Sequence, residues 1–182
     1  MKVEPLSLEG LLLIRPDVHE DARGIFLESY NRARYAAAGI AVPFVQDNHS
    51  RSTKGTLRGL HYQSEPGQAK LMRVGTGRIF DVAVDIRPQS ATFGQWEGVY
   101  LDAREHAQLL VPVGFAHGFC VLSDSADVLY KVSSVYDPGT ERSLSWCDPD
   151  LAVDWPVAEP LLSERDRHAP SFAELRRELG AS

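Results

Sequence analysis

The sequence predicts an all-β protein, built as a jelly roll with a few short peripheral helices. Short strand-like runs recur from about residue 10 to residue 147, and clusters of Gly, Pro, Asp and Ser separate them. Helix signals are scarce by comparison. Many short strands at this spacing are typical of a β-sandwich or barrel. We prefer the jelly roll because its mouth offers a cavity for a ligand.

The expected strands follow one another along most of the chain. In order they are Ile25–Tyr30, Phe44–Arg51, Leu57–Gln63, Lys70–Val74, Ile79–Ile86, Trp96–Leu101, Gln108–Val111, His117–Leu122, Val128–Tyr136 and Ser143–Cys147. The chain has 182 residues, and it contains no internal repeat and no low-complexity linker. We therefore expect a single domain spanning residues 1–182.

Two helices are expected at the periphery. Asn31 can cap a short helix that runs through Ala38 and is closed by Gly39. Ser171 can cap a final helix over Phe172 to Leu179, because Glu174 stands at the capping-box position and Gly180 follows.

Composition excludes several classes of function. The chain has 19 Lys and Arg and 25 Asp and Glu, which gives a net charge of −6, and it contains no basic block. Nucleic-acid binding is therefore disfavoured. The longest apolar run near the start, Leu11 to Ile14, is too short for a signal peptide or a membrane span, which predicts a cytoplasmic protein with no membrane partner. Two cysteines make no disulfide scaffold. Cys120 is expected to be buried, and a bridge to Cys147 stays open.

The segment Leu57–Gln63 contains the most informative histidine. Period-2 alternation places Leu57, Gly59, His61 and Gln63 on one face of a strand and the residues between them on the other. A histidine that shares a face with small and polar residues can line a cavity, and a strand can aim it at a substrate. The alternative is that His61 is a core or surface residue whose ring nitrogens are hydrogen-bonded and that has no catalytic role.

Other polar residues interrupt the apolar strands. Glu28 shares a face with Gly24 and Phe26, a polar run follows Phe44, and His117 stands between small residues. Each could line a pocket, and each has a structural alternative: an edge strand, a solvent-facing strand or a β-corner.

Tyr130 and Tyr136 lie six residues apart, which places both on one face of a strand unless a bulge intervenes. They could pack at a rim, or one could donate a proton. Asp166 could sit in a capped turn, or it could orient a histidine at the mouth of the barrel. No second histidine follows His61 at the next position on its face, so no metal site is predicted.

A set of segments in the same order resembles the dTDP-4-dehydrorhamnose 3,5-epimerase family, the cupin-like sugar-nucleotide epimerases. The segments are DARGIFLE from Asp21, FVQDNHS from Phe44, GTLRGLHYQ from Gly55, QAKLMRV from Gln68, IFDVAVDIR from Ile79, ATFGQW from Ala91, PVGFAHGF from Pro112, LYKVSSVYDP from Leu129 and LSERDRHAPSF from Leu162. They span nearly the whole chain, and the ordered set is more specific than any single piece.

The resemblance implies a cupin-type double-stranded β-helix that forms a homodimer and acts on dTDP-4-dehydro-6-deoxy-D-glucose without metal or nicotinamide cofactor. It assigns His61 as the base, Tyr130 as the acid, Asp166 as the partner of His61 and Lys70 as the stabiliser of the enolate. It assigns the nucleotide sugar to Arg23, Phe26, Glu28, Gln46, Asp47, Asn48, Arg58, His117, Tyr136, Glu141 and Arg165. Tyr136 would stack on the thymine, with Phe26 nearby.

The implied chemistry suits these residue types. A ketone at C4 acidifies the hydrogens at C3 and C5, so one base can remove either proton. A histidine titrates near ~6.5 and is mostly neutral at pH 7. A lysine can stabilise the charge that develops on the C4 oxygen, and arginines suit a diphosphate. The binding role assigned to Arg58 conflicts with the strand alternation, which places Arg58 on the opposite face from His61. A local bulge or a position at the rim of the cavity would resolve this conflict.

The sequence leaves three alternative functions open. A closely related enzyme could epimerise C3 alone or C5 alone of another dTDP-4-keto sugar. A metal-dependent cupin enzyme and a non-enzymatic carbohydrate-binding jelly roll belong to other classes.

Overall fold

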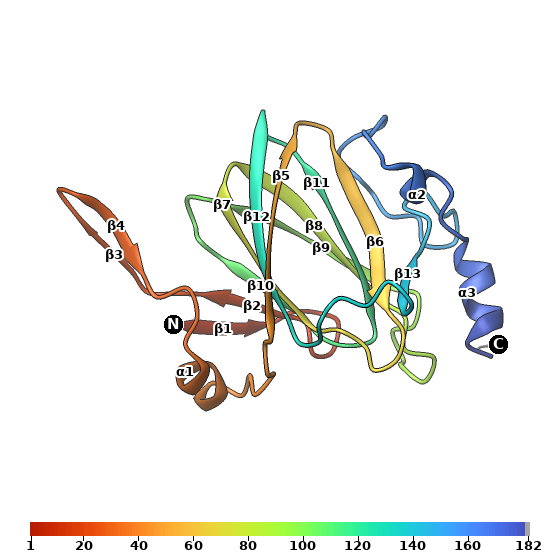
Figure 1. The fold of residues 1–182 in the computed structure, drawn as a ribbon, viewed down its shortest axis with the longest axis horizontal. Coiled ribbons are helices and arrows are strands. Elements are labelled where there is room, and N and C mark those ends of the chain that lie inside the picture. Colours follow the sequence, from red (N-terminus) through yellow and green to blue (C-terminus); the bar gives the residue numbers. More distant parts are fainter. Residues whose placement is uncertain (181–182) are drawn as a thin grey trace.

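Two antiparallel sheets face each other across the core (Figure 1). The computed structural model describes residues 1–180. The larger sheet has six strands in the order β1 (Lys2–Pro5), β2 (Leu12–Arg15), β10 (Gln108–Val111), β7 (Lys70–Thr76), β12 (Ser125–Val132) and β5 (Gln46–Thr53). The smaller sheet has five, in the order β13 (Glu141–Ser143), β6 (Leu57–Gln63), β11 (Phe115–Val121), β8 (Arg78–Asp85) and β9 (Trp96–Asp102). The predicted jelly roll is confirmed.

A third, two-stranded sheet is a hairpin of β3 (Val18–Asp21) and β4 (Gly24–Leu27). In Figure 1 it projects away from both large sheets. Every residue of β3 is exposed, and in β4 only Leu27 is partly buried.

The main core lies between the two large sheets. Leu13, Met72 and Leu109 point inward from the six-stranded sheet, and Ala83 and Phe119 meet them from the five-stranded sheet. All five side chains are at most 9 % exposed. Alternation along each strand supplies these inward positions.

A second core covers the outer face of the five-stranded sheet. Leu60 and Val82 pack there against Leu144, Leu151 and Phe172 from the C-terminal part of the chain. Helix α3 (Phe172–Glu178) belongs to this cover, and Ser171 and Glu174 form the predicted capping box. The cover brings the chain back toward β6.

Helix α1 (Arg32–Ala37) lies against the outer face of the six-stranded sheet. Asn31 caps it through the amides of Ala33 and Arg34, as predicted. Tyr35 is buried, and its hydroxyl donates to Gln108 Oε1 at 3.0 Å. Burial raises the pKa of Tyr35 to about 12.

Several boundaries differ from the expectations. Strand β12 ends at Val132, so the prediction that Tyr130 and Tyr136 share one strand was wrong, and Tyr136 lies in the following loop. The last strand is Glu141–Ser143 instead of Ser143–Cys147. The turn near Asp166 is a one-turn helix, α2 (Glu164–Arg167). Strands β1, β2 and β3 were not among the expected strands.

The two cysteines are both free, so the bridge left open by the sequence is not formed. Cys120 is buried, and burial raises the pKa of its thiol to about 11. Among residues 1–180, no helix is long and apolar enough to cross a membrane.

Candidate active site

A bulge in β6 turns Arg58 toward the face that carries His61. In the pairing with β11, His61 lies opposite His117 and Arg58 lies opposite Phe119. The two β11 residues are two positions apart, whereas the two β6 residues are three apart, so β6 contains one extra residue. The extra residue reverses the alternation, which confirms the local bulge, one of the two explanations that the sequence left open for Arg58.

Glycines allow the two strands to approach at this bulge. Gly59 has φ +137°, and a Cβ built on it would lie 2.5 Å from the Cα of Gly118. A Cβ on Gly118 would in turn lie 2.8 Å from the carbonyl oxygen of Arg58. Neither position has room for a larger residue, so these two glycines set the shape of the strand beside His61.

A cavity of about 120 Å³ opens between the two large sheets. Strands of both sheets line it, with Ser50, Lys70, Met72 and Tyr130 from the six-stranded sheet and Arg58, His61, His117 and Phe119 from the five-stranded sheet. Five residues that the sequence nominated, from segments far apart in the chain, therefore meet in one place.

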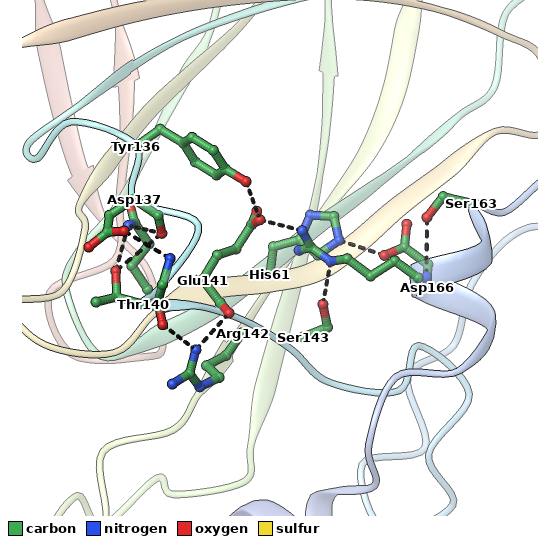
Figure 2. Close-up of polar contacts among 12 residues, drawn as sticks. His61, Tyr136, Asp137, Thr140, Glu141, Arg142, Ser143, Ser163 and Asp166 are labelled. Atoms are coloured by element: carbon green, nitrogen blue, oxygen red, sulfur yellow. Dashed lines mark hydrogen bonds and ion pairs between the residues drawn. The ribbon is translucent and has the colours of Figure 1, made fainter.

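His61 forms a short hydrogen bond with a buried carboxylate. Its Nε2 lies 2.6 Å from Oδ1 of Asp166, which is 3 % exposed (Figure 2). Burial lowers the pKa of His61, and the bond to Asp166 opposes this without reversing it. Burial alone would raise the pKa of Asp166, but hydrogen bonds from His61, Ser163 and the Gly59 amide bring it below its ordinary value. A neutral imidazole beside an ionised carboxylate follows, with Nε2–H as the donor and Nδ1 as the free base.

Helix α2 positions the carboxylate. Ser163 caps this helix by accepting a hydrogen bond at 3.1 Å from the Asp166 amide. The first turn of the helix thus fixes Asp166 at the edge of β6, 105 positions away in the sequence from its partner His61.

Lys70 is the buried cation of the cavity. Its ammonium donates to the carbonyl oxygen of His61 at 3.2 Å, and the residue is 9 % exposed. Burial lowers the pKa of Lys70 to about 8, against the opposing charges of Asp81 and Glu141. An ammonium that is poorly hydrated stabilises a nearby anion strongly.

Tyr130 is half-buried on the opposite sheet from His61. Burial raises the pKa of Tyr130, while the charge of Arg58 and a hydrogen bond with Asn48 lower it in part. The phenol therefore stays protonated at neutral pH and can donate a proton.

His117 forms a second buried pair beside the cavity. Its Nε2 lies 2.6 Å from Oδ1 of Asp81, and both side chains are at most 5 % exposed. The pair holds the imidazole of His117 in one orientation on the wall opposite Lys70.

The mouth of the cavity carries a network of charged and polar groups. Figure 2 shows Tyr136 with its hydroxyl directed at Glu141, and the O–H donates to Oε2 at 2.8 Å. Arg165 pairs with the same carboxylate and donates from Nε to Ser143 Oγ at 2.7 Å. Arg165 and Arg58 also line a hollow of about 430 Å³ that adjoins His61. Two guanidinium groups at one opening suit an anionic ligand.

The start of β5 forms the rim beside Tyr136. Gln46 donates from Nε2 to Asn48 Oδ1 at 2.8 Å, and its Oε1 accepts from the Tyr136 amide at 3.0 Å. The predicted residues Gln46 and Asn48 thus adjoin Tyr130 and Tyr136.

Four nominated residues are not brought to the cavity within one chain. Arg23 and Phe26 lie on the projecting hairpin, where Phe26 is 72 % exposed. Glu28 pairs with Arg34 at the start of α1. Asp47 is exposed and pairs with Lys131. The roles of these four residues, like those of the other nominated residues, stay predictions.

Comparisons with known proteins identify the family of this chain. A family model described as dTDP-4-dehydrorhamnose 3,5-epimerase matches residues 5–174. The chain belongs to the dTDP-4-dehydrorhamnose 3,5-epimerase family. It is accordingly an isomerase that acts on a carbohydrate, and the resemblance on which the sequence analysis relied is confirmed.

Similar proteins in this epimerase family cover almost the whole chain. A dTDP-4-dehydrorhamnose 3,5-epimerase of Pseudomonas aeruginosa is 52 % identical over 96 % of this chain and 97 % of its own. A dTDP-4-dehydrorhamnose 3-epimerase of Streptomyces niveus is 43 % identical over 97 % of this chain and 86 % of its own. The solved epimerase of Legionella pneumophila, in complex with dTDP-4-keto-L-rhamnose, has a TM-score of 0.91 at 48 % identity and covers 96 % of both chains.

Sequence reasoning missed three groups in this epimerase site. Asp81 stands within the apolar run Ile79–Ile86, and a carboxylate in a fully buried strand is a signal that could have found it. Ser50 and Ser143 carry no comparable local signal. Among residues 1–180, no three His, Cys, Asp or Glu side chains are grouped to hold a metal ion.

Proposed function

We propose that this protein is a dTDP-4-dehydrorhamnose 3,5-epimerase that converts dTDP-4-dehydro-6-deoxy-D-glucose to dTDP-4-dehydro-L-rhamnose. One observation carries the proposal: a base and an acid face the same cavity from opposite sheets, His61 from β6 and Tyr130 from β12. Inversion at a carbon requires proton removal on one face of the sugar ring and delivery on the other. A sugar bound between the two sheets meets both groups.

His61 removes the proton from C3 or C5. The bond from Nε2 to Asp166 leaves Nδ1 as the acceptor, and the lowered pKa of His61 keeps that nitrogen unprotonated at neutral pH. When Nδ1 takes the proton, Asp166 stabilises the imidazolium that forms. Positioned proton transfer of this kind contributes about 10²–10⁴ in rate.

Lys70 stabilises the enolate. Loss of the proton at C3 or C5 places negative charge on the C4 oxygen, and a buried ammonium directed at that oxygen lowers the barrier. A pKa of about 8 leaves Lys70 mostly charged at neutral pH. Tyr130 then returns a proton to the carbon from the other side, because its raised pKa keeps the phenol protonated.

The dTDP group binds at the mouth. Arg58 and Arg165 hold the diphosphate, Tyr136 stacks on the thymine, and His117, Glu141, Gln46 and Asn48 surround the sugar nucleotide. Arg165 now pairs with Glu141, so the diphosphate competes with that carboxylate for the guanidinium. No redox cofactor or metal takes part in this proton exchange.

A second copy of the chain completes the site in this proposal. The hairpin carries exposed Val18, Ile25 and Phe26, at 40 %, 51 % and 72 %, which favours a partner surface. In a homodimer the hairpin would bring Arg23 and Phe26 to the other subunit's thymine site. We further propose a cytoplasmic location. Phe26→Ser should shift the protein from dimer to monomer in sedimentation velocity and raise the KM, whereas a dimeric variant with unchanged KM would count against hairpin exchange.

Deuterium exchange tests the function. The protein is incubated in D₂O with dTDP-4-dehydro-6-deoxy-D-glucose, and NMR follows label at C3 and C5. The proposal expects label at both carbons and none with His61→Asn. Label at C3 alone would support the 3-epimerase activity named for the Streptomyces niveus relative, and binding without label would support a carbohydrate-binding module. Loss of activity with a chelator would instead favour a metal-dependent enzyme.

A further inference from the structure

The inner face of β5 presents a row of neutral polar side chains to the site. Gln46, Asn48, Ser50 and Ser52 share this face because they lie at alternate positions of one strand. Gln46 and Asn48 bond to each other, and Ser52 Oγ accepts from Arg58 Nε at 3.0 Å. Three of the four are therefore partnered.

Ser50 is the exception. Its Oγ is fully buried, and no hydrogen-bond partner is present among residues 1–180. One other buried side-chain atom shares this condition in the described part of the chain, Oδ2 of Asp81, but Asp81 does not line the cavity. Buried hydroxyls are nearly always bonded, so a lone one at a functional cavity requires an explanation.

The position of Ser50 supplies that explanation. Ser50 lines the same cavity of about 120 Å³ as His61, Lys70 and Tyr130, and not the hollow at the mouth where Arg165 lies. We propose that the Ser50 hydroxyl binds an oxygen of the sugar ring and holds the ring between His61 and Tyr130. This inference rests on the proposed function, since it assumes that the sugar occupies this cavity.

The chemistry of a hydroxyl favours a sugar over the other parts of the substrate. A serine O–H can donate to a keto oxygen or accept from a ring hydroxyl, and it rotates to suit either. The diphosphate has Arg58 and Arg165 at the mouth, and thymine requires an aromatic surface. The ring of the 4-keto-6-deoxyhexose is the part whose oxygens remain for a neutral partner inside the cavity.

The test is Ser50→Ala, with Ser50→Thr as the variant that retains the hydroxyl. If Ser50 binds only substrate, its removal relieves an unsatisfied group in the free protein, and Tm should rise by about 2–4 °C. The same change should lower kcat/KM for dTDP-4-dehydro-6-deoxy-D-glucose by about 3- to 10-fold, the equivalent of one neutral hydrogen bond. The Kd for dTDP alone should change less than twofold, and Ser50→Thr should recover most of kcat/KM.

The controls separate this inference from the function. Ser125→Ala removes an exposed hydroxyl outside the cavity and should change neither Tm nor kcat/KM. Wild-type deuterium exchange is measured first, and its absence would refute the proposed function itself. With wild-type exchange present, Ser50→Ala with kcat/KM within twofold of wild type overturns the role of Ser50. A loss in dTDP affinity equal to the loss in kcat/KM would overturn it as well.

Discussion

Lys70→Met should make the protein more stable and nearly inactive. Lys70 is 9 % exposed and lies among the cavity residues, so folding removes its ammonium from water. The pKa falls from 10.5 to about 8 for that reason. A lysine whose pKa is lower in the folded state destabilises that state while the ammonium is charged, and the penalty disappears as pH rises from the folded to the unfolded pKa.

The magnitude follows from the two pKa values. A difference of about 2.5 at about 1.36 kcal/mol for each pKa unit amounts to about 3.4 kcal/mol below pH 8. The methionine loses the bond to the His61 carbonyl, which offsets about 1 kcal/mol. We therefore expect a net gain near 2 kcal/mol at pH 7, or a Tm higher by about 4–8 °C. The loss of the charge at the developing enolate should lower kcat by about 10²–10³.

Urea unfolding at pH 7, 8, 9 and 10 measures the effect. The stability gap between variant and wild type should be largest at pH 7 and should close by about 1.4 kcal/mol per pH unit above pH 8. Lys54→Met is the matched control, because Lys54 is exposed, and it should stay within about 0.5 kcal/mol of wild type at every pH. A gap that does not change between pH 7 and 10, or a destabilised variant at pH 7, would refute the argument that burial sets the pKa of Lys70.

Three further predictions concern the site and the bulge. The value of kcat/KM should fall at or below about pH 6.5, where His61 becomes protonated, and again near pH 8, where Lys70 loses its proton. An acid limb above pH 7 would contradict the effect of burial on the pKa of His61. Asp166→Asn keeps the shape of the side chain but removes its charge, so kcat should fall by about 10²–10⁴ while the Kd for dTDP stays the same. A parallel change in kcat and in the Kd would indicate that the substitution disrupts the mouth of the cavity. In urea unfolding, Gly59→Ala should destabilise the fold by at least about 2 kcal/mol more than Gly24→Ala. Both glycines have positive φ, but only at Gly59 would the new Cβ lie 2.5 Å from a backbone atom, the Cα of Gly118. Equal effects would disprove the close contact with Gly118.

Sequence patterns predicted most of the fold because strand signals are local. Alternation identified strands such as Leu57–Gln63, and the caps at Asn31 and Ser171 identified both longer helices. The patterns failed where a strand ended without a strong breaker, as at Val132, and this separated Tyr136 from Tyr130.

Some active-site residues carry a local sequence signal, and others are recognised only by their contacts in the folded chain. His61 stood out because a histidine on a strand with small neighbours is a local anomaly. Asp166 had no local distinction from a carboxylate in a capped turn, and only its contact with His61 shows its place. The Ser50 hydroxyl stands out only in three dimensions, because no hydrogen-bond partner among residues 1–180 reaches it.

The sequence by itself determined which strands exist, which side chains alternate toward a core, and, through an ordered set of segments, the family. The tertiary structure decided three things: that β6 bulges to bring Arg58 beside His61, that α2 returns Asp166 to the same strand, and that Tyr130 faces His61 from the other sheet. The physical reason is the distance along the chain over which each interaction acts. Alternation and capping arise from backbone geometry over a few residues, whereas a bulge, a distant ion pair and a shared cavity depend on how two sheets pack, which no short pattern encodes.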